Sequence, residues 1–379
     1  MKHINIPIFI PQMGCPFQCI FCQQRYISHD GPPPAPSQIA AMIEPYLSTI
    51  RSDQTRVEVA FFGGSFTALP AGMQKDYLDA VQVFLQAGRV QSIRISTRPD
   101  CIDIEILDLL AERGVRTIEL GVQSFDDHVL QQSLRGYDAR QALEACRLIK
   151  SRGFNLGVQL MIGLPGDSLQ RDLNSTWTAI EMRPDMVRLY PTLVIAGTEL
   201  ESLYRKSLYR ALTLEEAVTI TREMYLAFQV MEIPVIRMGL HPGEELRQPG
   251  HVVAGPFHPA FGELVEQAVF KEQAVLLLTE KFRRHGHNRF PMLLVNDREI
   301  SKMIGWRRCN ITGIKNLFEL EFLEVVGNPE IPQGEVWLKY EEEAGLQAVM
   351  TRKELLQRVV VLGNNRKLNI STYSSSPLV

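Results

Sequence analysis

The feature that most restricts the fold is an alternation of short apolar runs with longer amphipathic stretches between residue 4 and about residue 237. The apolar runs have the length of strands and are rich in Val and Ile, without strict alternation, which is typical of parallel strands covered by helices. They occupy residues 4–10, 57–62, 92–97, 116–122, 154–162 and 185–190, with a candidate seventh at 234–239. Strands that alternate with helices predict a parallel sheet.

Amphipathic stretches of helical length fill the intervals between these runs. They lie near residues 36–50, 70–87, 102–113, 126–152, 168–182 and 213–231. Six such units predict an α/β protein built on a partial (β/α)6 TIM-like barrel. In such barrels the functional groups lie on the loops that follow the strands.

The length of 379 residues, of which 45% are hydrophobic, is enough for more than one domain. We expect the barrel over residues 1–240 and a linker loop with a helix over 241–288. A small α+β domain should follow over 289–362, and a tail over 363–379. We see no internal repeat.

The charge and cysteine content exclude several classes of protein. A formal net charge of −3 gives no global attraction to nucleic acid or membrane. The start "MKHINIPIFIPQMGC" can mimic a lipoprotein signal, but Asn5, Pro7 and Pro11 interrupt its apolar run. No run approaches the roughly 18 apolar residues of a membrane span. Six cysteines, three of them solitary, fit a reducing compartment, so we expect a cytoplasmic protein without a membrane partner.

The other three cysteines are clustered directly after the first apolar run, in "GCPFQCIFC". Cys15, Cys19 and Cys22 form C-x3-C-x2-C. A structural zinc site needs four ligands, commonly in two pairs, and no second pair is present, although His29 could complete a Cys3His site. An iron–sulfur cube held by three thiolates would keep one iron open to another ligand. Zinc remains the alternative.

Further polar and glycine-rich motifs follow the later runs. Gly63 and Gly64 would let the main chain approach a ligand closely. Any one of these motifs alone is an ordinary turn, but together they would share one rim of the barrel. They read "FFGGSF" (61–66), "RISTRPD" (94–100), "ELGVQSFDDHVL" (119–130), "LRGYD" (134–138) and "QLMIGLPGDS" (159–168).

In this order the motifs resemble the radical S-adenosylmethionine (SAM) superfamily, in the branch of the elongator catalytic subunit and oxygen-independent coproporphyrinogen III oxidase. The resemblance implies that Cys15, Cys19 and Cys22 hold a 4Fe–4S cluster whose open iron chelates SAM. It also implies cleavage of SAM to a 5′-deoxyadenosyl radical and reduced ferredoxin or flavodoxin as electron donor. The SAM contacts that it implies are Phe21, Gly63, Gly64, Ser65, Gln123, Arg135 and Gln159.

Three departures limit what the resemblance carries over. Ser65 stands where the commonest family motif has a carboxylate. Gln24 stands where the coproporphyrinogen oxidase has a further cysteine, which argues against that activity. The roughly 120 residues after the barrel show no obvious acetyltransferase domain such as the elongator subunit has, so acetyl-CoA chemistry is not expected.

The C-terminal region has its own pattern. Residues 290–326 predict strand, helix, "IGWR", helix and strand, and a strand at 334–340 and a helix at 351–361 follow. This order resembles a degenerate KH module, whose G-x-x-G loop grips the nucleic-acid backbone. Here the loop has Arg308 in place of the second glycine, and its candidate RNA contacts are Gly305, Arg307 and Arg308.

The same region carries excess positive charge. Two acidic residues, Asp297 and Glu299, oppose nine basic ones, as a local phosphate-binding patch would need. The alternative is a small lid whose charges are simply solvated. The nine are Lys281, Arg283, Arg284, Arg289, Arg298, Lys302, Arg307, Arg308 and Lys315.

These observations lead to one main hypothesis and two alternatives. The main hypothesis is a radical SAM enzyme that modifies RNA, with tRNA as the expected substrate. The first alternative is a radical SAM enzyme acting on a small molecule such as a tetrapyrrole-like compound, with the C-terminal domain as a lid. The second is a zinc-stabilised RNA-binding adaptor. The sequence does not indicate the catalytic residues or the product.

Overall fold

The computed structural model describes residues 2–10, 15, 18–23, 32–51, 55–240, 244–285, 290–340 and 345–363. The chain divides into two compact units. The first comprises Met1–Ala217 and Ile233–Pro259, and the second comprises Val218–Glu232 and Ala260–Val379. The domain boundaries expected from the sequence stay a prediction.

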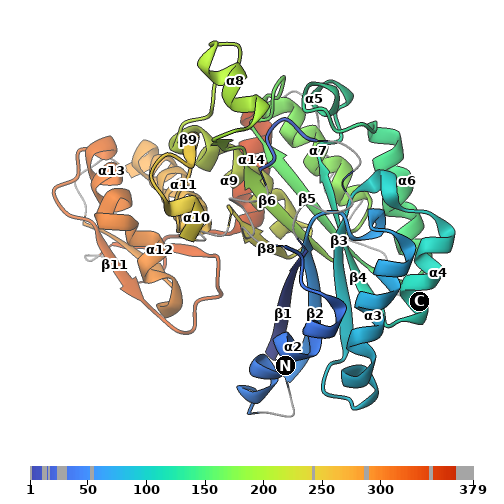
Figure 1. Cartoon of the computed structure of the whole chain (residues 1–379). Helices are drawn as coiled ribbons and strands as arrows, with labels where there is room; N and C mark the ends of the chain where they lie inside the picture. Colours follow the sequence, from blue (N-terminus) through green and yellow to red (C-terminus); the bar gives the residue numbers. More distant parts are fainter. Residues whose placement is uncertain are drawn as a thin grey trace. The chain divides into compact units, whose positions relative to one another are not determined.

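A parallel sheet forms the first unit, in the order β1-β2-β3-β4-β5-β6-β8 (Figure 1). Neighbouring strands follow one another in the chain, except that the short strand β7 lies between β6 and β8, and all six pairings are parallel. The expected partial TIM-like barrel is therefore confirmed. The strands are β1 (Lys2–Ile10), β2 (Thr55–Gly63), β3 (Ser92–Thr97), β4 (Val115–Gln123), β5 (Asn155–Ile162), β6 (Met186–Pro191) and β8 (Val235–Met238).

Helices connect these strands, and side-chain caps define where several of them start. Asp103 accepts from the Ile106 amide to begin α4, Asp138 forms a capping box with Gln141 at α6, and Ser168 caps α7. The α-helices of this unit are α2 (Ile39–Ser48), α3 (Ala71–Gln86), α4 (Ile104–Glu112), α5 (Asp127–Gln132), α6 (Ala139–Ser151), α7 (Leu169–Glu181), α8 (Glu199–Arg205) and α10 (Glu244–Arg247), and α9 (Leu214–Val230) runs from this unit into the second.

Short elements complete the unit. Three 3-10 turns, η1 (Pro36–Gln38), η2 (Phe66–Ala68) and η3 (Pro99–Cys101), interrupt the connections, and η2 and η3 follow the ends of β2 and β3. A two-stranded antiparallel sheet joins β7 (Val194–Ile195) to β9 (Val252–Ala254). The stretch 241–288, expected to be a linker loop with a helix, thus also contains the strand β9.

The two faces of the large sheet differ in polarity because successive side chains of a strand point to opposite sides. On β4, Ile118, Leu120 and Val122 are fully buried in the apolar core. Glu119 and Gln123, at alternate positions of the same strand, point to the other face, which becomes the polar interior of the partial barrel. This interior lies below the loops that carry the sequence motifs.

The second unit is a small α+β domain, as expected. Its sheet has the order β11-β10-β12-β13, with β11 parallel to β10 and β12 antiparallel to both β10 and β13 (Figure 1). The elements are α11 (Phe261–His285), β10 (Pro291–Val295), η4 (Asp297–Glu299), α12 (Ile300–Ile304), η5 (Trp306–Arg308), α13 (Cys309–Phe318), β11 (Glu324–Gly327), β12 (Val336–Tyr340), β13 (Ala348–Met350) and α14 (Arg352–Gly363). The KH-like identity of this domain stays a prediction.

No helix in the described part of the chain combines the length and the apolar character needed to cross a bilayer.

Candidate cofactor site

Residues that follow the carboxyl ends of the strands gather around one buried sulfur. The Cys19 side chain is 7% exposed. Its Sγ atom accepts hydrogen bonds from Arg135 Nη1 at 2.8 Å and from Arg98 Nη1 at 3.6 Å. Two guanidinium groups beside one sulfur suit an anionic group at this place.

Arg135 is fixed by several partners. Its Nε atom donates to the Tyr137 hydroxyl at 2.9 Å, and Nη2 donates to the Gly121 carbonyl at 2.6 Å. The guanidinium carbon lies 5.1 Å from the centre of the Tyr137 ring and 6.0 Å from that of the Phe21 ring. Burial lowers the pKa of Arg135, but Tyr137 and Cys19 raise it by more, so Arg135 is a permanent cation.

The loop around Cys19 is anchored on later parts of the unit. The Leu200 amide donates to the Ile20 carbonyl at 2.9 Å, and the Ile20 side chain packs against Val194 and Leu200. Phe21 packs against that cluster and against a second one that contains Met161. These contacts hold the end of the cysteine loop in place, with the Phe21 ring near Arg135.

The glycine motif forms a tight approach between two strands. Gly63 has φ of +111°, and a Cβ atom there would lie 2.6 Å from the Ile10 carbonyl oxygen, to which the Gly64 amide donates at 2.9 Å. The Ser65 hydroxyl is 2.8 Å from the Thr97 hydroxyl and accepts from the Arg98 amide at 3.2 Å. Because the hydroxyl is used in this way, the main chain is what this motif offers to a ligand.

Cys15 lies beside this motif. Cys15 is exposed as a residue, but the nearby protein partly shields its thiol from water and raises the thiol's pKa, while a main-chain hydrogen bond with Ser65 offsets part of that effect. The Cys22 amide donates to the Cys19 carbonyl at 3.0 Å, so these two cysteines form one turn. Among the residues that the structure describes, however, no three His, Cys, Asp or Glu side chains converge closely enough to hold a metal ion.

Gln123 and Gln159 meet at the inner end of the site. Gln159 Nε2 donates to Gln123 Oε1 at 3.1 Å. Gln123 ends β4 with φ of 69°, a left-handed conformation that non-glycine residues rarely adopt and that is often found at functional sites. At Gly121, a Cβ atom would lie 2.9 Å from Gln123 Nε2 and 3.8 Å from Arg135 Nη2. The glycine thus leaves room for both side chains.

Two residues of this cluster were not singled out from the sequence. Arg98 forms a bidentate ion pair with Asp100, at 2.9 Å for both bonds, and also contacts the Arg135 carbonyl. Tyr137 donates to the main chain of β4 and accepts from Arg135. Both lie inside motifs noticed above, "RISTRPD" and "LRGYD". Each has one partner two positions away, but the contacts of Arg98 with Cys19 and of Tyr137 with β4 join residues far apart in the chain, and local spacing does not reveal those.

A chain of buried ions lies in the barrel interior below this site. Glu58 pairs with Arg94 at 2.6 Å, Arg94 with Glu119 at 2.6 Å, and Glu119 with Arg188 at 2.8 Å. The Arg188 guanidinium also lies 5.1 Å from the centre of the Phe62 ring. Arg94 and Arg188 line a cavity of about 460 Å³ that opens at the amino ends of the strands.

The candidate RNA contacts form a turn in the second unit. Gly305, Arg307 and Arg308 all have positive φ, of 78°, 49° and 63°. The Arg307 guanidinium carbon lies 4.3 Å from the centre of the Trp306 ring, and the Trp306 side chain is 55% exposed. Of the nine basic residues, Lys302 is paired with Glu266, while Arg289 and the Arg284 side chain lie outside the described residues.

Comparison with known proteins gives matches over both parts of the barrel region. The model of the radical SAM superfamily matches residues 9–173, and that of the radical SAM C-terminal domain matches residues 184–271. Among solved structures, that of Elp3 from Methanocaldococcus infernus, with its residues 1–46 deleted, aligns with a TM-score of 0.53 and 21% identity. The alignment covers 90% of this chain and 75% of that one, and shows a shared fold.

Curated relatives cover less of the chain. An uncharacterised protein of Methanocaldococcus jannaschii is 31% identical over 209 residues, which are 54% of this chain and 61% of that protein. The tRNA uridine(34) acetyltransferase of M. infernus is 30% identical over 246 residues (54% and 46%), and mouse Elongator complex protein 3 is 29% identical over 237 residues (55% and 43%). The chain spans about half the length of the curated relatives it matches.

Proposed function

The chain belongs to the radical SAM superfamily, whose enzymes use a 4Fe–4S cluster and SAM, and from this premise we propose that it modifies tRNA. The observation that carries the cofactor part of the proposal is the Cys19 sulfur beside the guanidinium groups of Arg135 and Arg98. It places a cysteine of the triplet next to the fixed cation that would pair with the carboxylate of SAM. The zinc-stabilised adaptor is not favoured, because superfamily membership supplies a role for three cysteines without a fourth ligand.

We assign Cys15, Cys19 and Cys22 as the cluster ligands. The donor set fits, since three thiolates can hold a cube and keep one iron open for SAM. Reductive cleavage of SAM to a 5′-deoxyadenosyl radical is the chemistry that the cluster supplies when bound. The protein's own part is to fix the loop through Ile20 and Phe21 and to surround the Cys19 sulfur with cations.

The same geometry supports the SAM contacts that we propose. Arg135 is aligned by Tyr137 and Gly121, which suits a guanidinium that pairs with a carboxylate. The close approach at Gly63 supports a main-chain contact from this motif, because a side chain there would collide with Ile10. The complete proposed set is Phe21, Gly63, Gly64, Ser65, Gln123, Arg135 and Gln159.

Two observations support tRNA as the substrate. Two of the relatives named above are a tRNA uridine(34) acetyltransferase and an Elongator complex protein 3. In addition, the second unit exposes the basic turn with Arg307 and Arg308, which we propose as its RNA contact. Acetyl transfer is not part of the proposal. Enzymes of this class need an electron donor, and we propose reduced ferredoxin or flavodoxin, in the cytoplasm.

The ligand assignment is tested on protein purified without oxygen. Wild-type protein should contain about four iron and four sulfide ions per chain and should form 5′-deoxyadenosine from SAM when reduced. Cys19→Ala should lose the iron and the product, whereas the matched control Cys309→Ala, at an exposed cysteine of α13, should keep both. Iron retained in Cys19→Ala would contradict the assignment.

The substrate is tested in cells. Nucleosides from tRNA of cells with and without the gene should differ by one modified base in mass spectrometry, and the Cys19→Ala gene should not restore it. An unchanged nucleoside profile together with a changed small metabolite would instead indicate a small-molecule substrate.

A further inference from the structure

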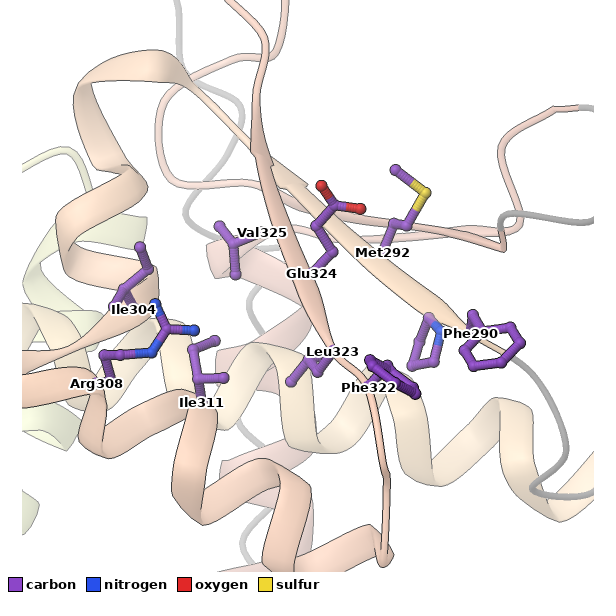
Figure 2. Close-up of a pocket in the computed structure, with 10 residues that line it drawn as sticks. Phe290, Met292, Ile304, Arg308, Ile311, Phe322, Leu323, Glu324 and Val325 are labelled. Carbon is purple, nitrogen blue, oxygen red and sulfur yellow. The ribbon is translucent and has the colours of Figure 1, made fainter.

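An open groove of about 640 Å³ lies in the second unit, between the start of β10, the strand β11 and the turn that joins α12 to α13 (Figure 2). Its apolar wall includes Met292, Ile304, Ile311, Leu323 and Val325. The volume falls in the range of sites for molecules the size of a nucleotide or a drug. The proposed function gives this groove no role so far.

Two exposed aromatic rings stand at one end of the groove. Phe290 and Phe322 are 43% and 56% exposed, and their ring centres are 5.6 Å apart at an angle of 60°. The domain has a core of its own, with Leu293, Val295 and Ile314 fully buried, so the two rings are not needed to complete it. Large aromatic side chains held in solvent next to an apolar wall indicate a binding surface.

Positive charge is concentrated at one end of the groove. Arg308 lies on the far side of the groove from the two rings (Figure 2), and Arg307 precedes it, stacked on the exposed Trp306. Between residues 297 and 316 there are five basic and two acidic residues. Glu324 is the acidic residue that lines the groove, and it extends from β11 on the side of Met292 and the two rings, away from Arg308 (Figure 2). A ligand that fits therefore has an anionic part near Arg308 and a flat, apolar part with hydrogen-bond donors near the rings and Glu324.

We propose that this groove binds unpaired nucleotides of a single-stranded RNA segment, an inference that rests on the proposed function and names the part of the RNA that is recognised. Bases of a single strand can stack on Phe290 and Phe322, while the phosphate groups meet Arg308 and Arg307. A carboxylate such as that of Glu324 can accept from an amino group of a base. A double helix keeps its bases stacked internally and could use only the arginines.

The test uses the full chain and fluorescence anisotropy. The probe is a labelled ten-nucleotide RNA of mixed sequence, as a single strand or annealed to its complement. Phe322→Ala should weaken binding of the single strand roughly 5- to 150-fold, the usual effect of losing one stacked base. Its binding of the duplex and the salt dependence of both should not change, because no charge is removed.

Two further variants control for folding and for general surface effects. Phe322→Tyr keeps a ring and should bind like the wild type. Leu317→Ala removes an apolar side chain that is 60% exposed on α13 and does not line the groove, and it should also bind like the wild type. Equal single-strand affinity of Phe322→Ala and wild type would overturn the proposal. Self-association that Phe322→Ala abolishes would assign the groove to a second copy of the chain and would also overturn it.

The result is independent of the cofactor chemistry. Phe322→Ala should contain wild-type amounts of iron and should cleave SAM at the wild-type rate. If wild-type protein bound no iron and cleaved no SAM, the proposed function would be wrong. The effect of Phe322→Ala on single-strand and duplex binding would still show whether the groove binds unpaired nucleotides.

Discussion

Gly63 shows how a single residue shapes the candidate site. Its φ of +111° is a backbone conformation that glycine adopts readily and other residues rarely do. A methyl group on Gly63 would also lie 2.6 Å from the Ile10 carbonyl oxygen, which is shorter than a van der Waals contact. The strands β1 and β2 must meet this closely for the loops that follow them to face each other. The position therefore has a structural cost for any side chain, whether or not a cofactor is bound.

We predict that Gly63→Ala lowers the free energy of unfolding by about 1–3 kcal/mol, the usual cost of a residue held in a forbidden backbone region. Chemical denaturation followed by circular dichroism measures the change. The control is Gly72→Ala in the first turn of α3, where a Cβ atom meets nothing within 4 Å, so the variant should be as stable as the wild type or slightly more stable. An equal decrease in the free energy of unfolding of both variants would show that the close contact with Ile10 does not contribute to the cost of Gly63→Ala.

At the scale of single residues, the sequence identified the motifs but did not predict which of their side chains are in contact. Cys15, Cys19 and Cys22 stand out because they are close together in the chain, and their role as ligands stays a prediction. Arg98 and Arg135 meet Cys19 across 79 and 116 positions of the chain, so no local pattern could connect them. Only the order of the sheet brings the loops after β1, β3 and β4 together.

At the scale of elements, periodicity located the strands and most helices of the barrel. The run expected at 116–122 became β4 (Val115–Gln123), and the helix expected at 168–182 became α7 (Leu169–Glu181). The stretch 126–152, expected as one amphipathic segment, forms two helices instead. Leu134 and Gly136 adopt positive φ there, and Asp138 caps the second helix, so the chain turns between them.

The barrel interior shows what the apolar pattern could not reveal. Glu119 on β4 lies between Arg94 on β3 and Arg188 on β6, and the Glu119 side chain is 7% exposed. Strand patterns predict which residues turn away from the apolar core, but not which of them pair across the strands. The register between the strands determines which side chains pair, and here it brings Glu119 within ion-pair distance of both Arg94 and Arg188.

We predict that Glu119→Gln lowers the free energy of unfolding by about 3–5 kcal/mol, because it leaves two buried guanidinium groups without their shared carboxylate. Urea denaturation of the purified protein measures it. The matched control is Glu44→Gln, at an exposed carboxylate that pairs with Arg89 at 2.7 Å, and its midpoint should stay at the wild-type value. A wild-type midpoint for Glu119→Gln would mean that water replaces the lost pairs.

At the scale of the whole molecule, the net charge is negative, whereas the surface proposed to bind RNA is locally positive. The chain carries a formal charge of −3, so a polyanion is repelled at long range and can be held only by a local basic surface. The turn with Arg307 and Arg308 is such a surface, exposed in the described part of the second unit. Binding through phosphate contacts releases counterions, so the dependence of affinity on salt counts those contacts.

We predict that Arg307→Ala/Arg308→Ala weakens tRNA binding and reduces the slope of log affinity against log salt by about 1.4 to 1.8, as two lost phosphate contacts require. Filter binding between 50 and 200 mM salt, a range in which such contacts change affinity strongly, measures it. The control Arg140→Ala/Arg210→Ala changes the net charge equally, at side chains 79% and 71% exposed in the first unit, and should keep the wild-type slope. If both double variants lost the same slope, net charge rather than the basic turn would govern RNA binding.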